Sequence, residues 1–373
     1  MKVEDFVSVL QTDFYTGVPD SLLRPLNDYL IEIFGENPQR HVIAANEGNA
    51  AAIAAGYHLA TGKIPAVYLQ NSGEGNIVNP FTSLLCPEVC GIPVIFIIGW
   101  RGEPGRADET QHRFQGKITA SLLDTLEIPY IILDKHLSAD DFAHKWVDMQ
   151  EKLTQGTPVG IIVRKGSLEY GWKLVYKNNE VLCREEILDA ILQAAKEDIF
   201  VSTTGKASRE IFELRVKRQE AHNHDFLNVG AMGHSSSIAL GIALQCPNKR
   251  VWCIDGDGAA LMHFGAWVVI GKVKPANLVH VLINNGAHES VGGVPTAAEQ
   301  VDFAAIAQAC GYKWFRSIAD RRNLLASLRE LQMVHGLAML EVKCAIGSRS
   351  DLGRPTLTPL QIKQEFMKYV SKE

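Results

Sequence analysis

Two polar turns in the second half of the chain carry residues that can bind a divalent cation. Gly256-Asp257-Gly258 follows the apolar run 251–254 after one intervening residue, Asp255, and Asn284-Asn285-Gly286 follows a second apolar run, 281–283. If both runs are neighbouring parallel strands, their carboxyl ends meet at one edge of the sheet. Carboxylate and amide oxygens are ligands of Mg²⁺, and backbone amides at a glycine-rich helix start bind phosphate. These turns therefore predict a phosphate site bridged by Mg²⁺.

The first turn also resembles the glycine fingerprint of nicotinamide dehydrogenases. Leu261 stands where the third glycine of that fingerprint belongs, and Asp257 would repel a pyrophosphate that carries no cation. A bound Mg²⁺ reverses this argument because it joins the carboxylate to the phosphate oxygens. The dehydrogenase interpretation is therefore the weaker one.

A carboxylate in the first half has a different setting. Glu47 follows the β-like run 41–45 and precedes the small-residue run 48–56. The helix dipole favours an acidic residue at such a position, which alone would explain Glu47. Beside a cofactor, the same carboxylate can transfer a proton.

Together these strings resemble the cofactor motifs of the thiamine diphosphate enzymes. The resemblance implies that Asp257, the Asn285 side chain and the Ala287 carbonyl ligate Mg²⁺, which holds the cofactor diphosphate. It also implies that Glu47 hydrogen-bonds the aminopyrimidine ring and helps to deprotonate the thiazolium, whose chemistry supplies an electron sink. Further implied cofactor contacts are Ser72, Gly73, Gly205, Lys206, Gly230, Met232, Gly256, Gly258 and Ala259.

One of these positions has a second interpretation, and one of the strings matches the family only in part. The resemblance makes Met232 the apolar support between the two rings of the cofactor, and a methionine of the protein core is the alternative. Residues 71–76 resemble the family's Ser-Gly-Pro-Gly turn, but Glu74 replaces its proline. The family's turn is therefore matched only in part.

The elements that position these residues alternate along the chain. Short β-like runs and alanine-rich helical runs follow one another from residue 40, and a second such set begins at residue 199. This pattern predicts an α/β fold with two doubly wound parallel-sheet domains of the thiamine diphosphate-binding type. Residues 165–183 lose the apolar periodicity, so we expect a pyrimidine-binding domain at 1–178 and a diphosphate- and Mg²⁺-binding domain at 179–373. That division leaves no room for a middle domain. Residues 356–373 are predicted to form a terminal amphipathic helix.

A closer resemblance rests on residues 16–21, 102–105, 108–112, 115–116 and 284–293. These strings are similar to those of the compact two-domain 2-oxo acid decarboxylases of phosphonopyruvate and sulfopyruvate, with the phosphonopyruvate branch nearer. The resemblance implies a carboxy-lyase that converts 3-phosphonopyruvate to phosphonoacetaldehyde and CO₂ in phosphonate biosynthesis, such as the route to 2-aminoethylphosphonate. Sulfopyruvate decarboxylation, carboligation and a subunit without turnover stay open as alternatives.

The implied reaction needs an acid to protonate the product and cations to bind an anionic substrate. Asp20 and His112 are the expected catalytic residues, with a helix cap and a surface loop residue as their alternative roles. The cations Arg24, Arg101, Arg106, Arg113 and Lys117 are available, and a solvated surface charge is the alternative for each. The expected substrate contacts are Asp20, His112, Gln115, Lys206, His288 and Glu289.

Composition limits the remaining classes of function. The chain has 373 residues, of which 46% are hydrophobic and 21% charged, so it is globular and long enough for two domains. It carries 37 Lys and Arg against 42 Asp and Glu, and this net charge of -5 gives no basic footprint for nucleic acid. No nucleic-acid partner is expected.

The N-terminal residues, the length of the apolar runs and the cysteines favour a cytoplasmic protein. Residues 1–5 lack a basic segment followed by an apolar core, and the strongest apolar run, 92–100, is too short to cross a membrane. The 7 cysteines are an odd number without CxxC spacing, which favours free thiols in a reducing compartment. Cys86 and Cys90 could bind a metal as a pair, but the interpretation that they are two small buried residues fits the sequence better. Because sites of the resembled family form between facing subunits, we expect a homo-oligomer, a dimer at minimum.

Overall fold

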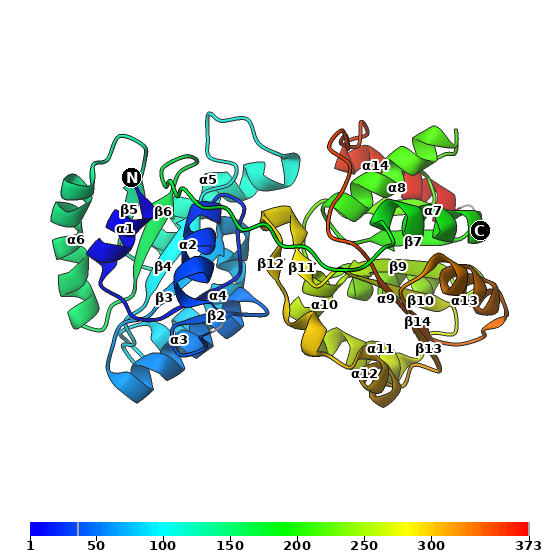
Figure 1. The fold of residues 1–373 in the computed structure, drawn as a ribbon, viewed down its shortest axis with the longest axis horizontal. Coiled ribbons are helices and arrows are strands. Elements are labelled where there is room, and N and C mark those ends of the chain that lie inside the picture. Colours follow the sequence, from blue (N-terminus) through cyan, green and yellow to red (C-terminus); the bar gives the residue numbers. More distant parts are fainter. Residues whose placement is uncertain (36, 372–373) are drawn as a thin grey trace. The chain divides into compact units, whose positions relative to one another are not determined.

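The computed structural model describes residues 1–35 and 37–371, which form two compact units. The first unit comprises Met1–Val175 and the second begins at Tyr176. Each unit contains a six-stranded sheet whose paired strands all run parallel, with helices packed against it (Figure 1). The predicted fold class, two doubly wound parallel sheets without a middle domain, is confirmed.

The first unit has the strand order β2-β1-β3-β4-β6-β5. Its central strands are continuous apolar runs because both faces of a parallel sheet are covered. Its elements in chain order are α1 (Val3–Leu10), β1 (Tyr15–Gly17), α2 (Arg24–Phe34), β2 (His41–Ile43), α3 (Glu47–Thr61), β3 (Ala66–Gln70), η1 (Asn71–Gly73), α4 (Glu74–Pro80), η2 (Phe81–Leu85), β4 (Ile95–Gly99), α5 (Thr110–Thr125), β5 (Tyr130–Leu133), α6 (Ala139–Thr154) and β6 (Val159–Val163).

The second unit has the strand order β13-β14-β10-β9-β7-β8. A separate hairpin, β11 with β12, is antiparallel. Its elements in chain order are α7 (Arg184–Ala194), β7 (Ile199–Ser202), α8 (Lys206–Lys217), β8 (Asp225–Leu227), α9 (Ser235–Gln245), β9 (Val251–Gly256), α10 (Asp257–Met262), α11 (Gly265–Val273), β10 (Leu278–Asn284), β11 (Ala287–His288), η3 (Glu289–Val291), β12 (Val294–Pro295), η4 (Ala297–Gln300), α12 (Phe303–Cys310), β13 (Trp314–Ile318), α13 (Arg321–Met333), β14 (Ala338–Lys343) and α14 (Pro359–Val370).

Alternation along the central strands explains why both faces of each sheet are buried. On β9, Trp252 and Ile254 enter one hydrophobic cluster, whereas Val251 and Cys253 enter another. Successive side chains of a strand point to opposite faces, so the two clusters lie on opposite sides of the sheet. The strands therefore hold their carboxyl-terminal turns on a packed support.

The end of the chain follows the predicted pattern over most of its length. The terminal helix was expected at residues 356–373, and α14 occupies Pro359–Val370 with a Thr358 N-cap; residues 372–373 lie outside the described residues. Within residues 1–35 and 37–371, no helix has the length and apolar character that a membrane span requires.

Candidate active site

Asp257 and Asn285 lie at the ends of neighbouring strands in the second unit. β9 and β10 pair in parallel with Gly256 opposite Ile283, so the residues after both strands meet at one edge of the sheet. Asp257 is the first residue of α10 and is 3% exposed, while Asn285 is 7% exposed. The structure thus brings together the two side chains expected to bind the cation.

Neutral groups surround the Asp257 carboxylate. Thr296 donates its hydroxyl to Oδ2 at 2.5 Å, and the backbone amides of Gly258 and Asn285 also donate to the carboxylate. Burial raises the pKa of Asp257 to about 6, and these hydrogen bonds oppose that rise. A buried carboxylate whose donors are neutral fits a divalent cation, which would supply the missing positive charge.

Sequence reasoning did not identify Thr296. The β11–β12 hairpin pairs Ala287 with Pro295, and the Thr296 amide donates to the Gly286 carbonyl at 2.9 Å. This return of the chain places the Thr296 hydroxyl on Asp257. The signal in the sequence was slight: a threonine after a valine-proline pair, a few residues beyond two adjacent glycines.

Glu289 fixes the orientation of the Asn285 amide. The Asn285 Nδ2 atom donates to Glu289 Oε2 at 3.0 Å, while Asn285 Oδ1 accepts from the Ala287 amide at 3.0 Å. Arg184 and Lys206 hold the Glu289 carboxylate at 2.7 and 2.5 Å, and these two cations help to hold its pKa below the ordinary value. Because a carboxylate only accepts, the amide nitrogen must face Glu289 and the oxygen must face away.

Two glycines of the expected phosphate turns are favoured for different reasons, Gly205 by its backbone conformation and Gly258 by a close neighbour. Gly205 has a φ of +94° immediately before α8, a conformation that side chains disfavour. At Gly258, a Cβ would lie 2.9 Å from the His288 ring. Thr204 donates to the Val229 carbonyl at 2.7 Å, which ties the Gly205 turn to the next loop.

The loop that follows β8 carries Gly230 and Met232. The Asn228 side chain accepts from the Gly230 amide at 3.3 Å, and Ala231 has a φ of +47°. Met232 is partly exposed, so the structure places it outside the fully buried core. Its contact with the cofactor stays a prediction, as does the alternative role in core packing.

Glu47 and Gly73 are in direct contact in the first unit. Glu47 begins α3, is 4% exposed, and accepts from Asn76 Nδ2 at 2.7 Å. Any side chain at position 73 would collide with the Glu47 carboxylate, so glycine is required there. Ser72, in the same turn, donates to Gln70 Oε1 at 2.8 Å. Glu47, Ser72 and Gly73, the residues of this unit expected to contact the cofactor, thus lie on α3 and on the η1 turn that touches its first residue.

Asp20 combines a structural role with an unusual protonation preference. Its Oδ2 atom accepts from the amides of Leu22 and Leu23 at 3.0 and 3.2 Å, so it does cap the turn before α2. Its Oδ1 atom accepts from Gln70 Nε2 at 2.6 Å. Complete burial raises the pKa of Asp20, and the hydrogen bond from Gln70 and the charge of Arg101 oppose that rise. Both roles considered for this residue are thus compatible.

Arg101 lies at a cleft beside Asp20. Its guanidinium makes two hydrogen bonds to Asp108, at 2.6 and 2.9 Å, and a third to Ser21 Oγ at 3.0 Å. The cleft measures about 260 Å³, and its walls are Ser21, Leu22, Trp100, Arg101, Glu103, Arg106, Ala107, Asp108 and Lys165. Three cations face two acids there, so the cleft is suited to an anionic ligand.

His112 is half-buried in the first turn of α5. Burial lowers the pKa of His112, and the nearby charge of Arg101 lowers it further, so the neutral imidazole is favoured. Gly102 permits the close packing, because a side chain at that position would collide with the His112 carbonyl. Asp20 and His112 therefore share Arg101 as a neighbour.

Gln115 contacts a buried acid that sequence reasoning did not identify as functional. Glu74, the residue in place of the family's proline, is fully buried and accepts from Gln115 Nε2 at 3.0 Å. Burial raises the pKa of Glu74 to about 8, and the hydrogen bonds from Gln115 and Thr119 oppose that rise. The structure gives Gln115 a protein partner, and its expected substrate contact stays a prediction.

The remaining expected substrate residues, Lys206, His288 and Glu289, lie in the second unit. Lys206 is held by Glu289. The expected cofactor contact Ala259 is buried within α10. Burial lowers the pKa of His288 to about 4, so this ring is neutral near pH 7. His288 therefore provides a hydrogen-bonding group rather than a positive charge.

Two protein-family models match the chain, one in each unit. The N-terminal TPP binding domain of thiamine pyrophosphate enzymes matches residues 4–124, and the C-terminal TPP binding domain matches residues 203–342. A phosphonopyruvate decarboxylase of Streptomyces viridochromogenes is 33% identical over 377 residues, which cover 95% of this chain and 90% of the relative. The chain belongs to the phosphonopyruvate decarboxylase family. It is a thiamine pyrophosphate-dependent carboxy-lyase.

Other relatives place the chain within this family more finely. A phosphonopyruvate decarboxylase of Streptomyces hygroscopicus is 32% identical, with 95% of this chain and 90% of the relative covered. A sulfopyruvate decarboxylase of Methanosarcina acetivorans is 25% identical, with 98% and 96% covered. Sulfopyruvate decarboxylases are thus more distant relatives of this phosphonopyruvate decarboxylase family member.

Proposed function

We propose that this protein uses thiamine diphosphate and Mg²⁺ to convert 3-phosphonopyruvate to phosphonoacetaldehyde and CO₂ in phosphonate biosynthesis, such as the route to 2-aminoethylphosphonate. The observation that carries the proposal is the similarity, over nearly the whole chain, to relatives named phosphonopyruvate decarboxylase. The buried Glu47 and Asp257, each at the carboxyl end of a strand, support the cofactor assignment.

The second unit would hold Mg²⁺ and the diphosphate. Asp257, the Asn285 side-chain oxygen and the Ala287 carbonyl are the proposed cation ligands, because they offer the hard oxygen donors that Mg²⁺ prefers. Gly256, Gly258, Ala259, Gly205 and Lys206 are the proposed diphosphate contacts, and Gly230 and Met232 the proposed contacts of the pyrimidine. We assign diphosphate binding to residues 179–373 and pyrimidine binding to residues 1–178.

Glu47 is the proposed proton-transfer group of the first unit. Bound thiamine diphosphate supplies an electron sink for the pair that remains when CO₂ leaves. The Glu47 carboxylate would hold a proton at the aminopyrimidine ring, and Asn76 and Gly73 fix the carboxylate in one position. A fixed carboxylate needs no reorganisation during proton transfer, which favours catalysis.

Asp20 and His112 are the proposed groups that manage the proton delivered to the product carbon. Burial favours the protonated form of Asp20, and a protonated carboxyl can donate. The neutral His112 can pass a proton on, because burial and, after it, the charge of Arg101 lower its pKa. The carbon that loses CO₂ must be protonated before the aldehyde leaves, so both groups have a defined task.

The cleft at Arg101 is the proposed entrance of the anionic substrate. Arg101, Arg106 and Lys165 lie at its walls, and a phosphonate carries more charge than the methyl group of pyruvate. Glu103 and Asp108 already pair with the two arginines and hold them in place. The cleft therefore has arginines held in fixed positions and one more positive than negative side chain.

We further propose a cytoplasmic homo-oligomer, a dimer at minimum. Glu47 and Asp257 lie in different compact units, and both would have to contact one cofactor molecule. Facing units of two copies would provide this arrangement in the manner implied by the family resemblance. Activity that falls on dilution below the dimer dissociation constant would support the oligomer.

Aldehyde formation from phosphonopyruvate, sulfopyruvate and pyruvate tests the function directly. We would measure all three in parallel with purified protein, with and without Mg²⁺ and thiamine diphosphate. A strong preference for phosphonopyruvate that disappears without the cofactors is expected. Turnover of sulfopyruvate instead would keep the chemistry and overturn the substrate, and tight cofactor binding without any turnover would overturn the lyase assignment.

A further inference from the structure

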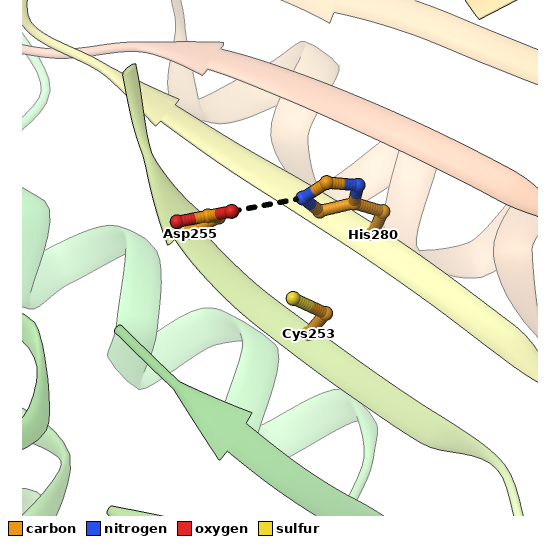
Figure 2. Close-up of side chains that lie close together, drawn as sticks. All are labelled: Cys253, Asp255 and His280. Atoms are coloured by element: carbon orange, nitrogen blue, oxygen red, sulfur yellow. Dashed lines mark ion pairs between the residues drawn. The ribbon is translucent and has the colours of Figure 1, made fainter. Parts of the chain in front are cut away.

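A second polar cluster lies inside the apolar core of the second unit, beneath the turns that carry Asp257 and Asn285. Cys253 and Asp255 are on β9, and His280 is opposite Cys253 on β10. Cys253 and His280 are 0% exposed and Asp255 is 1% exposed. Figure 2 shows the three side chains converging on one space between the two strands. Three chemistry-bearing side chains in this apolar setting require an explanation.

The atoms that face one another do not satisfy one another. Asp255 Oδ2 and His280 Nε2 are 3.4 Å apart, and neither atom makes a hydrogen bond within the described part of the chain. A charge-assisted hydrogen bond between these groups would be nearer 2.8 Å. Asp255 Oδ1 is used elsewhere, because it accepts from the Gly256 amide at 3.0 Å. The missing hydrogen bond of Asp255 is therefore confined to Oδ2, the oxygen that faces His280.

The sulfur atom of Cys253 completes a set of three ligand atoms. The thiol sulfur, the carboxylate oxygen and the imidazole nitrogen all lie within 4.8 Å of one another. Zinc binds nitrogen and oxygen at about 2.0–2.1 Å, and tetrahedral angles then separate two such ligand atoms by about 3.3 Å. The observed 3.4 Å between Asp255 and His280 matches that separation.

The surroundings of His280 fit the role of a metal ligand. Its Nδ1 atom lies 3.2 Å from the Tyr312 hydroxyl, and the edge of the Trp267 ring packs against it. Histidines that bind metals use their second nitrogen to bind an orienting partner in the same way. Tyr312 thus holds the ring with Nε2 directed toward Asp255.

We propose that Cys253, Asp255 and His280 bind a transition-metal dication of the zinc class. The set is electrically balanced, because one thiolate and one carboxylate neutralise a dication and the imidazole is neutral. A neutral assembly is the form that an apolar core accepts most readily.

Metal uptake would release the thiol proton. Burial raises the pKa of the Cys253 thiol well above its ordinary value, so the metal-free protein keeps this thiol protonated. The dication would form a bond to sulfur, and the displaced proton would leave to solvent. No electron is transferred, and the thiolate formed in this step, together with the Asp255 carboxylate, balances the two charges of the dication.

This site differs in ligand chemistry from the Mg²⁺ site proposed at Asp257. Thiolate is a soft donor and imidazole a borderline one, and both suit zinc-class ions, whereas Asp257 and Asn285 offer oxygen alone. The bound dication would fasten β9 to β10 directly below the turns that carry Asp257 and Asn285. Its role is therefore structural, and it makes no contact with substrate.

Metal analysis of the full-length protein tests the proposal. We would express the wild-type chain with added zinc, remove loosely bound metal with a chelator, and measure metal by mass spectrometry. About one zinc ion per chain is expected in the wild type and in Asp257→Ala, and about a tenth of that in Cys253→Ser. Cys344→Ser, which changes another fully buried cysteine outside the cluster, should keep the metal.

Two measurements protect the test against a variant that misfolds. Circular dichroism would establish that each variant is folded, and cobalt reconstitution of the wild type should give the absorption typical of a thiolate–cobalt bond. Wild-type protein with less than about a tenth of an ion per chain and no such absorption overturns the proposal. Metal that is lost in Asp257→Ala but kept in Cys253→Ser overturns it too, because the ion would then belong to the Asp257 site.

Discussion

The side-chain nitrogen of Asn285 lies 3.0 Å from a Glu289 carboxylate oxygen, and this contact decides which face of the amide is presented to a cation. Glu289 is itself held by Arg184 at 2.7 Å, and Arg184 is held by Glu210 through two further hydrogen bonds. The orientation of a proposed Mg²⁺ ligand therefore depends on a buried ion network behind it. Such supporting contacts change metal affinity by about 10- to 100-fold.

Glu289→Gln should weaken Mg²⁺ binding by about tenfold, because glutamine can present an NH₂ group to Asn285 and allow its amide to turn. Calorimetric titration of Mg²⁺ in the presence of thiamine diphosphate measures this effect without turnover. Glu299→Gln, at an exposed position in η4, is the matched control. Unchanged Mg²⁺ affinity in a folded Glu289→Gln variant would show that Asn285 does not need this partner.

Glu47→Gln should lower turnover by about a hundredfold or more, the scale of a lost acid–base group. Glutamine has nearly the same shape and can still contact Asn76, so we expect cofactor affinity to stay close to that of the wild type. Single-turnover kinetics and calorimetry separate the two quantities. Full activity in this variant would contradict the proposed proton transfer.

The two roles of Asp20 can be separated by two substitutions. Asp20→Asn keeps an oxygen for the amides of Leu22 and Leu23 but removes the acidic proton and places an NH₂ group against Gln70 Nε2, so turnover should fall about a hundredfold and part of the unfolding free energy should be lost. Asp20→Ala removes the cap as well and should also cost about 1 kcal/mol of unfolding free energy. Denaturant unfolding and steady-state kinetics measure the two effects. Equal activity in Asp20→Asn and the wild type would leave Asp20 with the cap alone.

Local patterns predicted the parts of the site that follow strands directly. Asp257 and Asn285 were expected to be neighbours because each follows an apolar run, and adjacent parallel strands end at the same edge. The contact between Thr296 and Asp257 could not be predicted in this way, since it depends on the β11–β12 hairpin folding back. Strand spacing indicates where a turn lies but not which distant loop returns to it.

Burial of acids was the second feature that residue patterns did not indicate. Glu74 was noted only as a departure from the family's turn, because a glutamate in a polar stretch is ordinarily exposed. The α5 helix packs against η1, directly before Glu74, and Gln115 and Thr119 of α5 provide its partners. Burial results from the packing of whole helices, so a short string of residues does not reveal it.

The buried Glu74 predicts that the folded protein loses stability as pH rises. In the fold its pKa is about 8, whereas the model-peptide value is 4.5, so the folded state keeps a proton that the unfolded chain releases between these values. Unfolding then releases a proton, and the free energy of unfolding falls as pH rises through this range. Glu74→Gln stays neutral and can still accept from Gln115, so it should escape this loss.

Denaturant unfolding at a series of pH values measures the effect. The wild type and Glu74→Gln should have similar stability near pH 4.5, and the variant should become the more stable of the two as pH approaches about 8. Glu88→Gln, at an exposed position after η2, should follow the wild type throughout. A constant difference between wild type and Glu74→Gln across the range would mean that Glu74 titrates as an ordinary glutamate, because only a shifted pKa makes the difference depend on pH.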